Sequence, residues 1–411
     1  GTSDSNQLWL DVAVYDGERL IGRSGGMDPE GRVDPWSYFV NAYVLDRKGQ
    51  RINRRNGQDI FVPLYDHQIP PGAADVVHYR MTLPDNIKGP VSIEVRLKYR
   101  KFDTEYLQHI QGDKFNGNRL PVTTMASDRI VLPVVNGLTI DTDTGSSIPE
   151  WERWNDYGIG LLREGNSGSS KGELRQAEQV FKRVEAINPG QGALNLARVY
   201  FKEGRLDEAS AAIHRASQTT PPAPPWTLAW FSARIDHENG HLDNAIESLE
   251  RIYDNQFETA AARGFDFSYD TNLLNELGRI NFERARMERG KKRRQQREGF
   301  LQTSLRWFTR TLKIDPENPP AHYNLALVYA ELDKPELASH HRQQHDLFRP
   351  DDHAIEIAVT RHRQNNPAAD HAAAPFVIYD LNRPQAYGSN DDTSPQAPES
   401  APLTRNELTS P

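Results

Sequence analysis

The chain contains no cysteine, and this one absence removes several kinds of protein chemistry. Disulfide bonds, cysteine nucleophiles, thiolate zinc sites and covalent attachment of c-type haem all need a thiol. No apolar run approaches the roughly 18 residues that a membrane-spanning helix needs, so we predict no membrane span. The net charge of −8 provides no general attraction to nucleic acid, and we predict no nucleic-acid partner.

Familiar catalytic motifs are missing as well. The sequence has no GxSxG, no phosphate-binding P-loop, no GxGxxG after a predicted strand and no HExxH. Each of these motifs carries a reaction through fixed geometry, so their absence removes the common routes to hydrolysis, nucleotide chemistry and hydride transfer. We therefore predict that the chain is not an enzyme.

Residues 1–140 have the pattern of a β domain. Apolar and polar side chains alternate along residues 90–102, which places them on opposite faces of a strand. Shorter alternating runs occur at residues 8–14 and 79–83, and Gly- or Pro-containing turns separate them. Many short strands joined by polar turns predict an antiparallel β-sandwich, followed by a linker at 141–150.

After the linker the periodicity becomes helical and the sequence repeats itself. Residues 194–221 form a helix–turn–helix pattern in which the small residues Ala197 and Ala209 face each other and Gly204 makes the turn. The small residue of the second helix recurs at positions 177, 209, 245, 304 and 338. This spacing is close to the 34-residue period of tetratricopeptide repeats, except across a basic insertion near 284–297.

We therefore predict about five tetratricopeptide repeats at 151–366, stacked as an α-solenoid because one repeat cannot bury its apolar face alone. Residues 353–366 are interpreted as the closing helix of this array. Residues 367–411 are predicted to be an extended tail, in which the apolar stretch 376–381 packs back as a strand or arm. The predicted fold class is α+β, with several domains.

Several phrases of the sequence resemble a known family. They are SGGMDPEGRVDPWSYF at 24–39, the segments 59–80, 88–102 and 120–130, and PFVIYDLNRP at 375–384. They resemble the region that follows the haem-binding part of bacterial multihaem c-type cytochromes, proteins that often continue into tetratricopeptide repeats. The chain departs from that family because it has no CxxCH motif, so no haem-attaching residue is carried over.

The resemblance implies an exported role associated with electron transfer, in the periplasm or outside the cell. It also implies that any haem c belongs to a partner or to a segment missing from this chain. We predict no cofactor in the chain itself.

Three arginines are the first candidate for a binding site. Register between the repeats places Arg198, Arg234 and Arg279 in one column of the first helices, which line the groove of a tetratricopeptide array. The planar guanidinium suits a carboxylate, so the groove is predicted to bind an acidic segment of a partner chain. The alternative is that these arginines pair with Glu203, Glu238 and Glu276 on their own helices. Neighbouring columns add Trp230, Asn275 and Tyr323 to the predicted groove.

The basic insertion is a second candidate. Its centre is Lys291, Lys292, Arg293 and Arg294, which we interpret as a docking patch for an acidic partner, a phosphate-rich polymer or a membrane surface. The alternative is a solvated extension of a helix.

Histidines and acidic turns raise the question of metal binding. His67 is the candidate distal haem ligand if haems lie on a neighbouring segment, and the alternative is a hydrogen-bonded loop histidine. His341 and His345 would share a helix face, but no nearby acid completes a site, so we predict no metal. The acidic turns 28–34 and 141–145 are interpreted as ordinary turns rather than calcium sites.

Three functions follow from these features. The leading hypothesis is a non-enzymatic scaffold of an exported electron-transfer assembly that binds a partner chain, for example a multihaem c-type cytochrome, through its groove. The second is a haem-capping redox subunit whose haem-binding part is separate or removed. The third is a structural subunit of an extracellular filament, in which 376–381 adds a strand to a neighbouring copy.

Overall fold

The computed structural model of the chain describes residues 6–133, 146–165 and 171–388. The acidic turn 141–145, the first half of the predicted linker and the tail after 388 lie outside them. The described residues divide into two compact units. Unit 1 comprises those within 1–71, 77–146 and 352–411, and unit 2 comprises 72–76 together with 147–351. Among the helices of the described ranges, none has the length and apolar character needed to cross a membrane.

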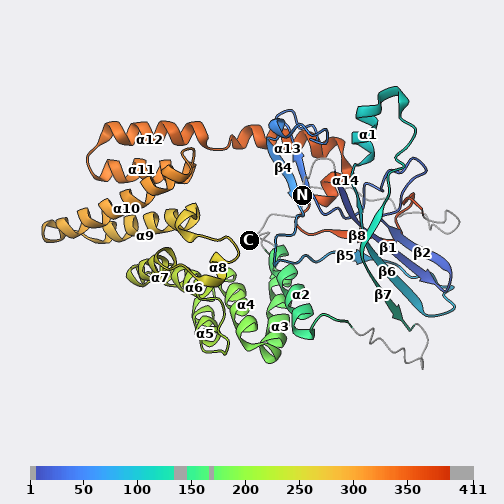
Figure 1. The fold of residues 1–411 in the computed structure, drawn as a ribbon, viewed down its shortest axis with the longest axis horizontal. Coiled ribbons are helices and arrows are strands. Elements are labelled where there is room, and N and C mark those ends of the chain that lie inside the picture. Colours follow the sequence, from blue (N-terminus) through green and yellow to red (C-terminus); the bar gives the residue numbers. More distant parts are fainter. Residues whose placement is uncertain (1–5, 134–145, 166–170, 389–411) are drawn as a thin grey trace, which may run out of the picture. The chain divides into compact units, whose positions relative to one another are not determined.

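The centre of unit 1 is a four-stranded antiparallel sheet in the order β2-β1-β6-β7 (Figure 1). Its long middle strands pair along their whole length, and Val12 lies opposite Val95. The alternation read from the sequence therefore builds one apolar face, where Val12, Val14 and Val91 are almost fully buried. The four strands are β1 (Gln7–Asp16), β2 (Arg19–Ser24), β6 (Val91–Arg100) and β7 (Thr123–Leu132).

Smaller elements complete unit 1. Two-stranded sheets form from β3 with β4 and from β5 with β8. The antiparallel sheet at the N-terminal end is present as predicted, but a sandwich of two full sheets is not confirmed in the residues described. The elements are β3 (Ala42–Leu45), β4 (Val62–Asp66), β5 (His78–Arg80), β8 (Ile378–Asp380), α1 (Thr104–Gln111), α13 (Asp352–Asn365) and α14 (Pro367–Ala372).

The C-terminal part of unit 1 is held by strand pairing and by buried side chains. Strand β8 runs parallel to β5, with Tyr379 opposite Tyr79. The backbone of Leu381 accepts from Arg23 N at 2.8 Å and donates to Arg80 O at 2.9 Å, and its side chain joins the core of the sheet. The helix predicted to close the repeat array, 353–366, instead groups with the β domain. Its amphipathic pattern predicts a helix but cannot indicate which core the helix covers.

Unit 2 consists of helices that pack in consecutive pairs (Figure 1). The pairs are α2 with α3, α4 with α5, α6 with α7, α9 with α10 and α11 with α12. Their bounds are α2 (Glu150–Glu164), α3 (Lys171–Ile187), α4 (Pro189–Lys202), α5 (Leu206–Ser217), α6 (Pro225–Glu238), α7 (Leu242–Asp254), α9 (Thr271–Met287), α10 (Arg294–Ile314), α11 (Pro319–Glu331) and α12 (Pro335–Phe348), with a short α8 (Glu258–Ala261) between α7 and α9.

Small residues allow the two helices of each pair to approach closely. A Cβ atom added to Gly158 would lie 2.5 Å from the ring of Phe181, and one added to Gly278 would lie 2.7 Å from the ring of Phe308. Both phenylalanines are completely buried. The same contact therefore recurs in the first and fourth pairs, which is the packing that the sequence register predicts.

The turns between paired helices need a left-handed backbone at one position. Gly204 and Gly240 occupy it with φ of +73° and +77°, and Asp333 occupies the equivalent position with φ of +56°. Glycine adopts this conformation without steric cost, and aspartate is one of the few other residues that tolerate it. The turn geometry of the repeats is thus kept even where the glycine is missing.

Candidate functional sites

Arg198 on α4 and Arg234 on α6 lie together between two successive first helices of unit 2. The guanidinium of Arg198 lies 5.4 Å from the ring centroid of Phe231, and that of Arg234 lies 5.1 Å from the ring centroid of Phe201. The two phenylalanine rings meet edge to face, with centroids 6.3 Å apart. Cation–π attraction on both sides therefore holds the two arginines in a crossed arrangement.

Neither of these arginines has a carboxylate partner in the part of the chain that the structure describes. Glu203, the alternative partner of Arg198, pairs instead with Arg205 at 2.9 Å. The Nε atoms of Arg198 and Arg234 are buried and lack a hydrogen-bond acceptor among the described residues. Burial lowers the pKa of Arg198, as expected for a cation that lacks a compensating charge. An added anion would accept hydrogen bonds from the guanidinium groups of both arginines.

Arg279 behaves differently from the other two. It pairs with Glu276 at 2.5 Å and with Glu283 at 3.0 Å on its own helix, α9. Glu283 also contacts Nε2 of His237 at 2.7 Å. Arg279 therefore forms the local pair that the alternative predicted, and its charge is compensated. The three arginines are not equivalent.

The remaining predicted groove residues also lie on first helices of the pairs, namely α6, α9 and α11. Trp230 is half-buried on α6, with the guanidinium of Arg234 6.0 Å from its ring centroid. Asn275 donates to Oδ1 of Asn318 at 3.0 Å, which ties α9 to the N-terminus of α11. Tyr323 on α11 is 50% exposed. Trp230 thus borders Arg234, which is one of the two arginines without a carboxylate partner among the described residues.

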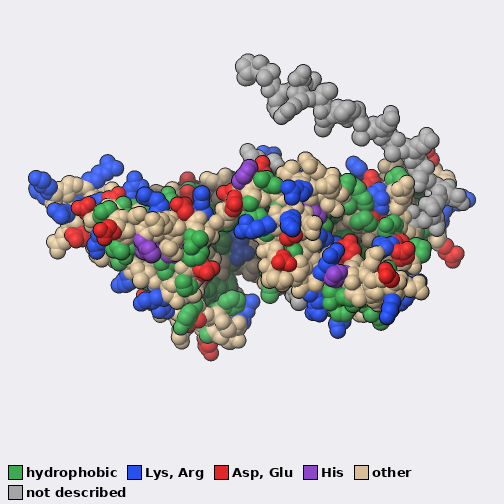
Figure 2. Space-filling view, turned by 90° about the horizontal axis from the view of Figure 1, so that it is seen from above, with side chains coloured by type: hydrophobic (Ala, Val, Ile, Leu, Met, Phe, Trp, Pro, Cys, Tyr) green, Lys and Arg blue, Asp and Glu red, His purple; other side chains and the backbone are tan. Residues whose placement is uncertain are grey.

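The predicted basic patch forms the connection between α9 and α10. Lys291, Lys292 and Arg294 are exposed and have no carboxylate partner among the described residues, whereas Arg293 lies 3.3 Å from Glu288. Figure 2 shows Lys and Arg side chains gathered at its left end, where Figure 1 places this connection. The patch is accessible, but hydrated surface lysines and arginines are common and define no ligand.

His67 lies in unit 1 between two aromatic rings. Its ring stacks on Tyr65 with centroids 4.4 Å apart and on Tyr38 with centroids 5.1 Å apart. Its Nδ1 atom lies 3.3 Å from the carbonyl oxygen of Phe39. Haem ligation by His67 stays a prediction.

Two histidines of the last helix pair, His322 and His341, contact each other. Nδ1 of His341 lies 2.9 Å from Nδ1 of His322, whose Nε2 lies 2.9 Å from the carbonyl oxygen of Pro316. Burial, together with His322 and His340, lowers the pKa of His341 to about 4. Within the described ranges no group of three or more His, Asp or Glu side chains is arranged to hold a metal ion.

This histidine pair predicts a pH dependence of stability. An unfolded histidine titrates near pH 6.5, so between pH 6.5 and 4 the unfolded chain binds a proton that folded His341 does not. Stability is therefore complete above pH 6.5 and falls as the pH decreases toward 4. Because His341 is partly exposed, we expect the free energy of unfolding of unit 2 to fall by about 1 kcal/mol between pH 7 and pH 5. Urea unfolding at the two pH values measures this change. The variant His341→Asn should lose most of this dependence, and an unchanged dependence in the variant would exclude His341 as its origin.

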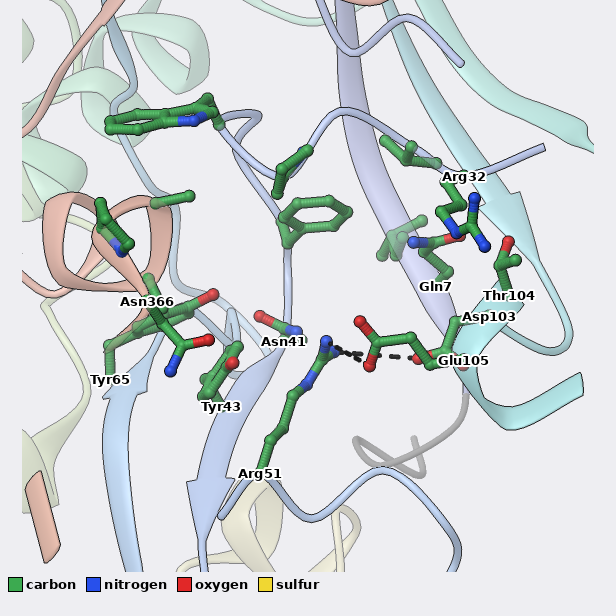
Figure 3. A pocket seen from close by; sticks show the side chains of 18 of the residues that line it. Gln7, Arg32, Asn41, Tyr43, Arg51, Tyr65, Asp103, Thr104, Glu105 and Asn366 are labelled. Carbon is green, nitrogen blue, oxygen red and sulfur yellow. Dashed lines mark hydrogen bonds and ion pairs between the residues drawn. The ribbon is translucent and has the colours of Figure 1, made fainter. Parts of the chain in front are cut away.

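A cavity of about 440 Å³ lies within unit 1. Trp36, Phe39 and Tyr65 supply aromatic surface, and Arg51, Asp103 and Glu105 supply charge (Figure 3). The Arg51 guanidinium contacts Glu105 at 3.2 Å and Asp103 at 3.8 Å, and it lies 4.6 Å from the ring centroid of Tyr43. Figure 3 also shows Asn41 beside Arg51, and Oδ1 of Asn41 has no hydrogen-bond partner in the part of the chain that the structure describes.

Asp103 is the charged group of this cavity whose ionisation depends most clearly on its surroundings. Asp103 caps α1 by accepting from the backbone N–H of Tyr106 at 2.7 Å, and burial raises its pKa to about 6 despite the attraction of Arg51. The cavity can therefore change its charge near neutral pH. Residues from both ends of the chain line it, including Tyr387. Sequence reasoning did not identify this cavity, because its residues are scattered and follow no motif.

The acidic turn at 28–34 is closed by its own groups. The backbone N–H of Arg32 donates to Oδ1 of Asp28 at 2.7 Å, and the Arg32 side chain pairs with Asp28 and Glu30. Asp34 accepts from the backbone N–H of Trp36 at 3.1 Å and pairs with Arg383. These carboxylates are engaged in the turn chemistry that the sequence indicates.

Comparison with known proteins identifies the repeats. Family models of the tetratricopeptide repeat match residues 170–230 and 307–338. No curated protein matches the sequence. Among solved structures, MamA (AMB-1) is 18% identical with a TM-score of 0.34, covering 48% of this chain and 97% of its own. YrrB, described as a tetratricopeptide repeat protein with an unusual peptide-binding site, is 18% identical with a TM-score of 0.34, covering 52% and 94%. The two family models confirm that these segments of the chain are tetratricopeptide repeats.

Proposed function

We propose that the chain is a non-enzymatic interaction scaffold. Its helix pairs stack as a tetratricopeptide solenoid, and an acidic segment of a partner chain binds at Arg198 and Arg234. The observation that carries this proposal is the pair of half-buried arginines from successive repeats, neither of which is compensated by a carboxylate of the described residues. Unpaired buried cations are costly in a folded protein, so their presence is best explained by an anion that arrives with a partner.

The neighbouring rings define what the partner carries beside its carboxylate. Phe201 and Phe231 frame the two guanidinium groups, and Trp230 lies next to Arg234. A segment with an acidic residue and an adjacent apolar side chain would satisfy the charge and cover the exposed parts of these rings. Large aromatic and arginine side chains are also the residues that most often dominate binding energy in interfaces.

The cellular context rests on the sequence resemblance alone. We propose a multihaem c-type cytochrome as a partner, in a periplasmic or extracellular assembly, with unit 1 as the part that docks to it. Haem capping by unit 1 and assembly into a filament are the alternatives. A complex purified from the native source that shows a haem absorbance band supports the cytochrome context, and a colourless complex refutes it.

The acidic-segment proposal predicts a specific loss of affinity. Peptides selected from a phage-displayed random library on the full chain should be rich in Asp and Glu. Arg198→Gln and Arg234→Gln should each weaken the best peptide by about tenfold or more, because a charge-assisted hydrogen bond contributes roughly 1.5–3 kcal/mol. The affinities can be measured by fluorescence polarisation.

Arg279→Gln is the matched control for these variants. It removes the same side chain from the same column, but its charge is already compensated by Glu276 and Glu283. We expect a change of less than about threefold, in line with the small energies of exposed pairs. Equal losses in all three variants, or selected peptides without acidic residues, would contradict the proposal.

A further inference from the structure

A second cavity lies in unit 2 between α7 and α10, and none of the predicted groove residues lines it. It is open to one side and has a volume of about 370 Å³. Glu250, Tyr253 and Asp254 line it from α7, and Arg306, Trp307 and Arg310 line it from α10. Each helix thus supplies one aromatic ring and two charged side chains of one sign.

The two walls of the cavity, one formed by α7 and the other by α10, carry opposite charges. Glu250 and Asp254 are four residues apart on one helix, and so are Arg306 and Arg310 on the other, so each pair shares a helix face. None of these four side chains takes part in an ion pair within 4.0 Å in the ranges that the structure describes. Burial and the neighbouring Asp254 raise the pKa of Glu250, although the charge of Arg306 acts in the opposite direction.

The basic wall also contains hydrogen-bond donors without acceptors. Trp307 is only 6% exposed, and within the described ranges neither its indole Nε1–H nor the Nε–H of Arg310 has a hydrogen-bond acceptor. The indole nitrogen can only donate, so no rearrangement of its own ring removes the deficit. Leaving a buried donor unpaired costs about 1–3 kcal/mol, and a bound acceptor would remove that cost.

Aromatic contacts hold this wall in place. The Trp307 ring meets Tyr253 edge to face with centroids 4.8 Å apart. The guanidinium of Arg306 lies 5.2 Å from the ring centroid of Trp307, and that of Arg310 lies 5.6 Å from the ring centroid of Tyr269. The arginines are thus positioned by ring contacts and not by the acids across the cavity.

We propose that this cavity binds a small zwitterion of the amino-acid type. The carboxylate of the ligand accepts from the Trp307 indole N–H and from Arg310 and Arg306. Its ammonium group lies against Glu250 and Asp254, and the Tyr253 ring borders its aliphatic part. An anion or a cation alone would compensate only one wall, whereas a zwitterion compensates both. The volume lies within the range of small-molecule sites.

Titration calorimetry of the full chain with a panel of standard amino acids tests this site. At least one amino acid should bind with a Kd of about 1 mM or tighter. Its analogue without the amino group and its analogue without the carboxyl group should each bind at least about tenfold more weakly. Failure of every amino acid to bind at that level, or equal binding of either analogue, would overturn the proposal.

Substitutions assign the binding to this cavity. Glu250→Gln and Arg310→Gln should each weaken the best amino acid by about tenfold. Glu247→Gln and Arg251→Gln are matched controls on α7, because these two exposed residues pair with each other at 3.3 Å and do not line the cavity. Unchanged affinity in the first two variants would place the ligand elsewhere and refute the site. If a variant fails to fold, the comparison of analogues on the natural chain still decides the outcome.

Discussion

A chain that ends at Asp351 is expected to lose the folded state of unit 1 while the helices of unit 2 stay folded. The deletion removes β8 and with it Tyr379 and Leu381, which are 3% and 6% exposed in the full chain. It also removes His362, whose Nδ1 lies 2.9 Å from Gly49 O and whose Nε2 lies 3.0 Å from the Tyr43 hydroxyl. Each large core truncation costs about 2–5 kcal/mol, and several together exceed the roughly 5–15 kcal/mol that stabilises a typical domain.

Hydrogen exchange with mass spectrometry measures this loss for each unit separately. Amides of β1 and β6 should exchange fast in the shortened chain, and amides of α4 and α9 should stay protected. The single substitution Leu381→Ala is a milder form of the same test, with an expected loss of about 2–4 kcal/mol. Leu347→Ala, at a residue that is 69% exposed, is its control and should change little. Slow exchange of β1 and β6 in the shortened chain would show that unit 1 does not need its C-terminal part.

Gly278→Ala is expected to destabilise unit 2 by about 2 kcal/mol. The added Cβ would lie 2.7 Å from the ring of Phe308, which is completely buried and cannot move away without disturbing its neighbours. Overpacking of this kind costs about 1–3 kcal/mol, and the better helix propensity of alanine offsets part of it. Urea unfolding followed by circular dichroism at a helix wavelength gives the change directly.

Gly299→Ala has the opposite expected sign. Gly299 is also in a helix, α10, but a Cβ added there meets nothing within 4 Å. Alanine should therefore stabilise the helix by about 0.5–1 kcal/mol through propensity alone. If Gly278→Ala and Gly299→Ala stabilise unit 2 equally, the close contact between Gly278 and Phe308 is not part of the repeat packing.

The repeats could be predicted because their packing leaves a local signature. A small residue on the second helix, a turn glycine and a matching small residue on the first recur at nearly constant spacing, and all three are close in sequence. Where the glycine is replaced, as at Asp333, the surrounding pattern still identifies the turn. The strand β6 could be predicted for a similar reason, since alternation over ten residues is visible in the sequence alone.

Which segments of the chain come together in unit 1 could not be predicted in the same way. The apolar stretch 376–381 was expected to pack back as a strand or arm, and β8 is there, but its partner β5 lies about 300 residues earlier. Local patterns give the type of an element and not its distant neighbour. The same limit applies to α13. Its pattern predicts a helix, but the helix belongs to unit 1 and not to the repeat array in which it was placed.

The candidate groove shows a third limit. Register correctly groups Arg198, Arg234 and Arg279 on first helices, but it does not indicate which of them has a partner. Arg279 pairs with Glu276 as the alternative predicted, whereas Glu203, the alternative partner of Arg198, pairs with Arg205. Spacing along a helix permits several pairs, and the choice among them depends on side chains from the neighbouring helix.

Hydrogen exchange of the full chain with and without the selected acidic peptide is the most direct test of the central claim. If the peptide binds at Arg198 and Arg234, amides of α4 and α6 should exchange more slowly in the complex, and those of unit 1 should not change. The Arg198→Gln variant at the same peptide concentration should show little of this protection. Protection confined to unit 1, or to helices other than α4 and α6, would contradict the assignment of this surface as the partner site.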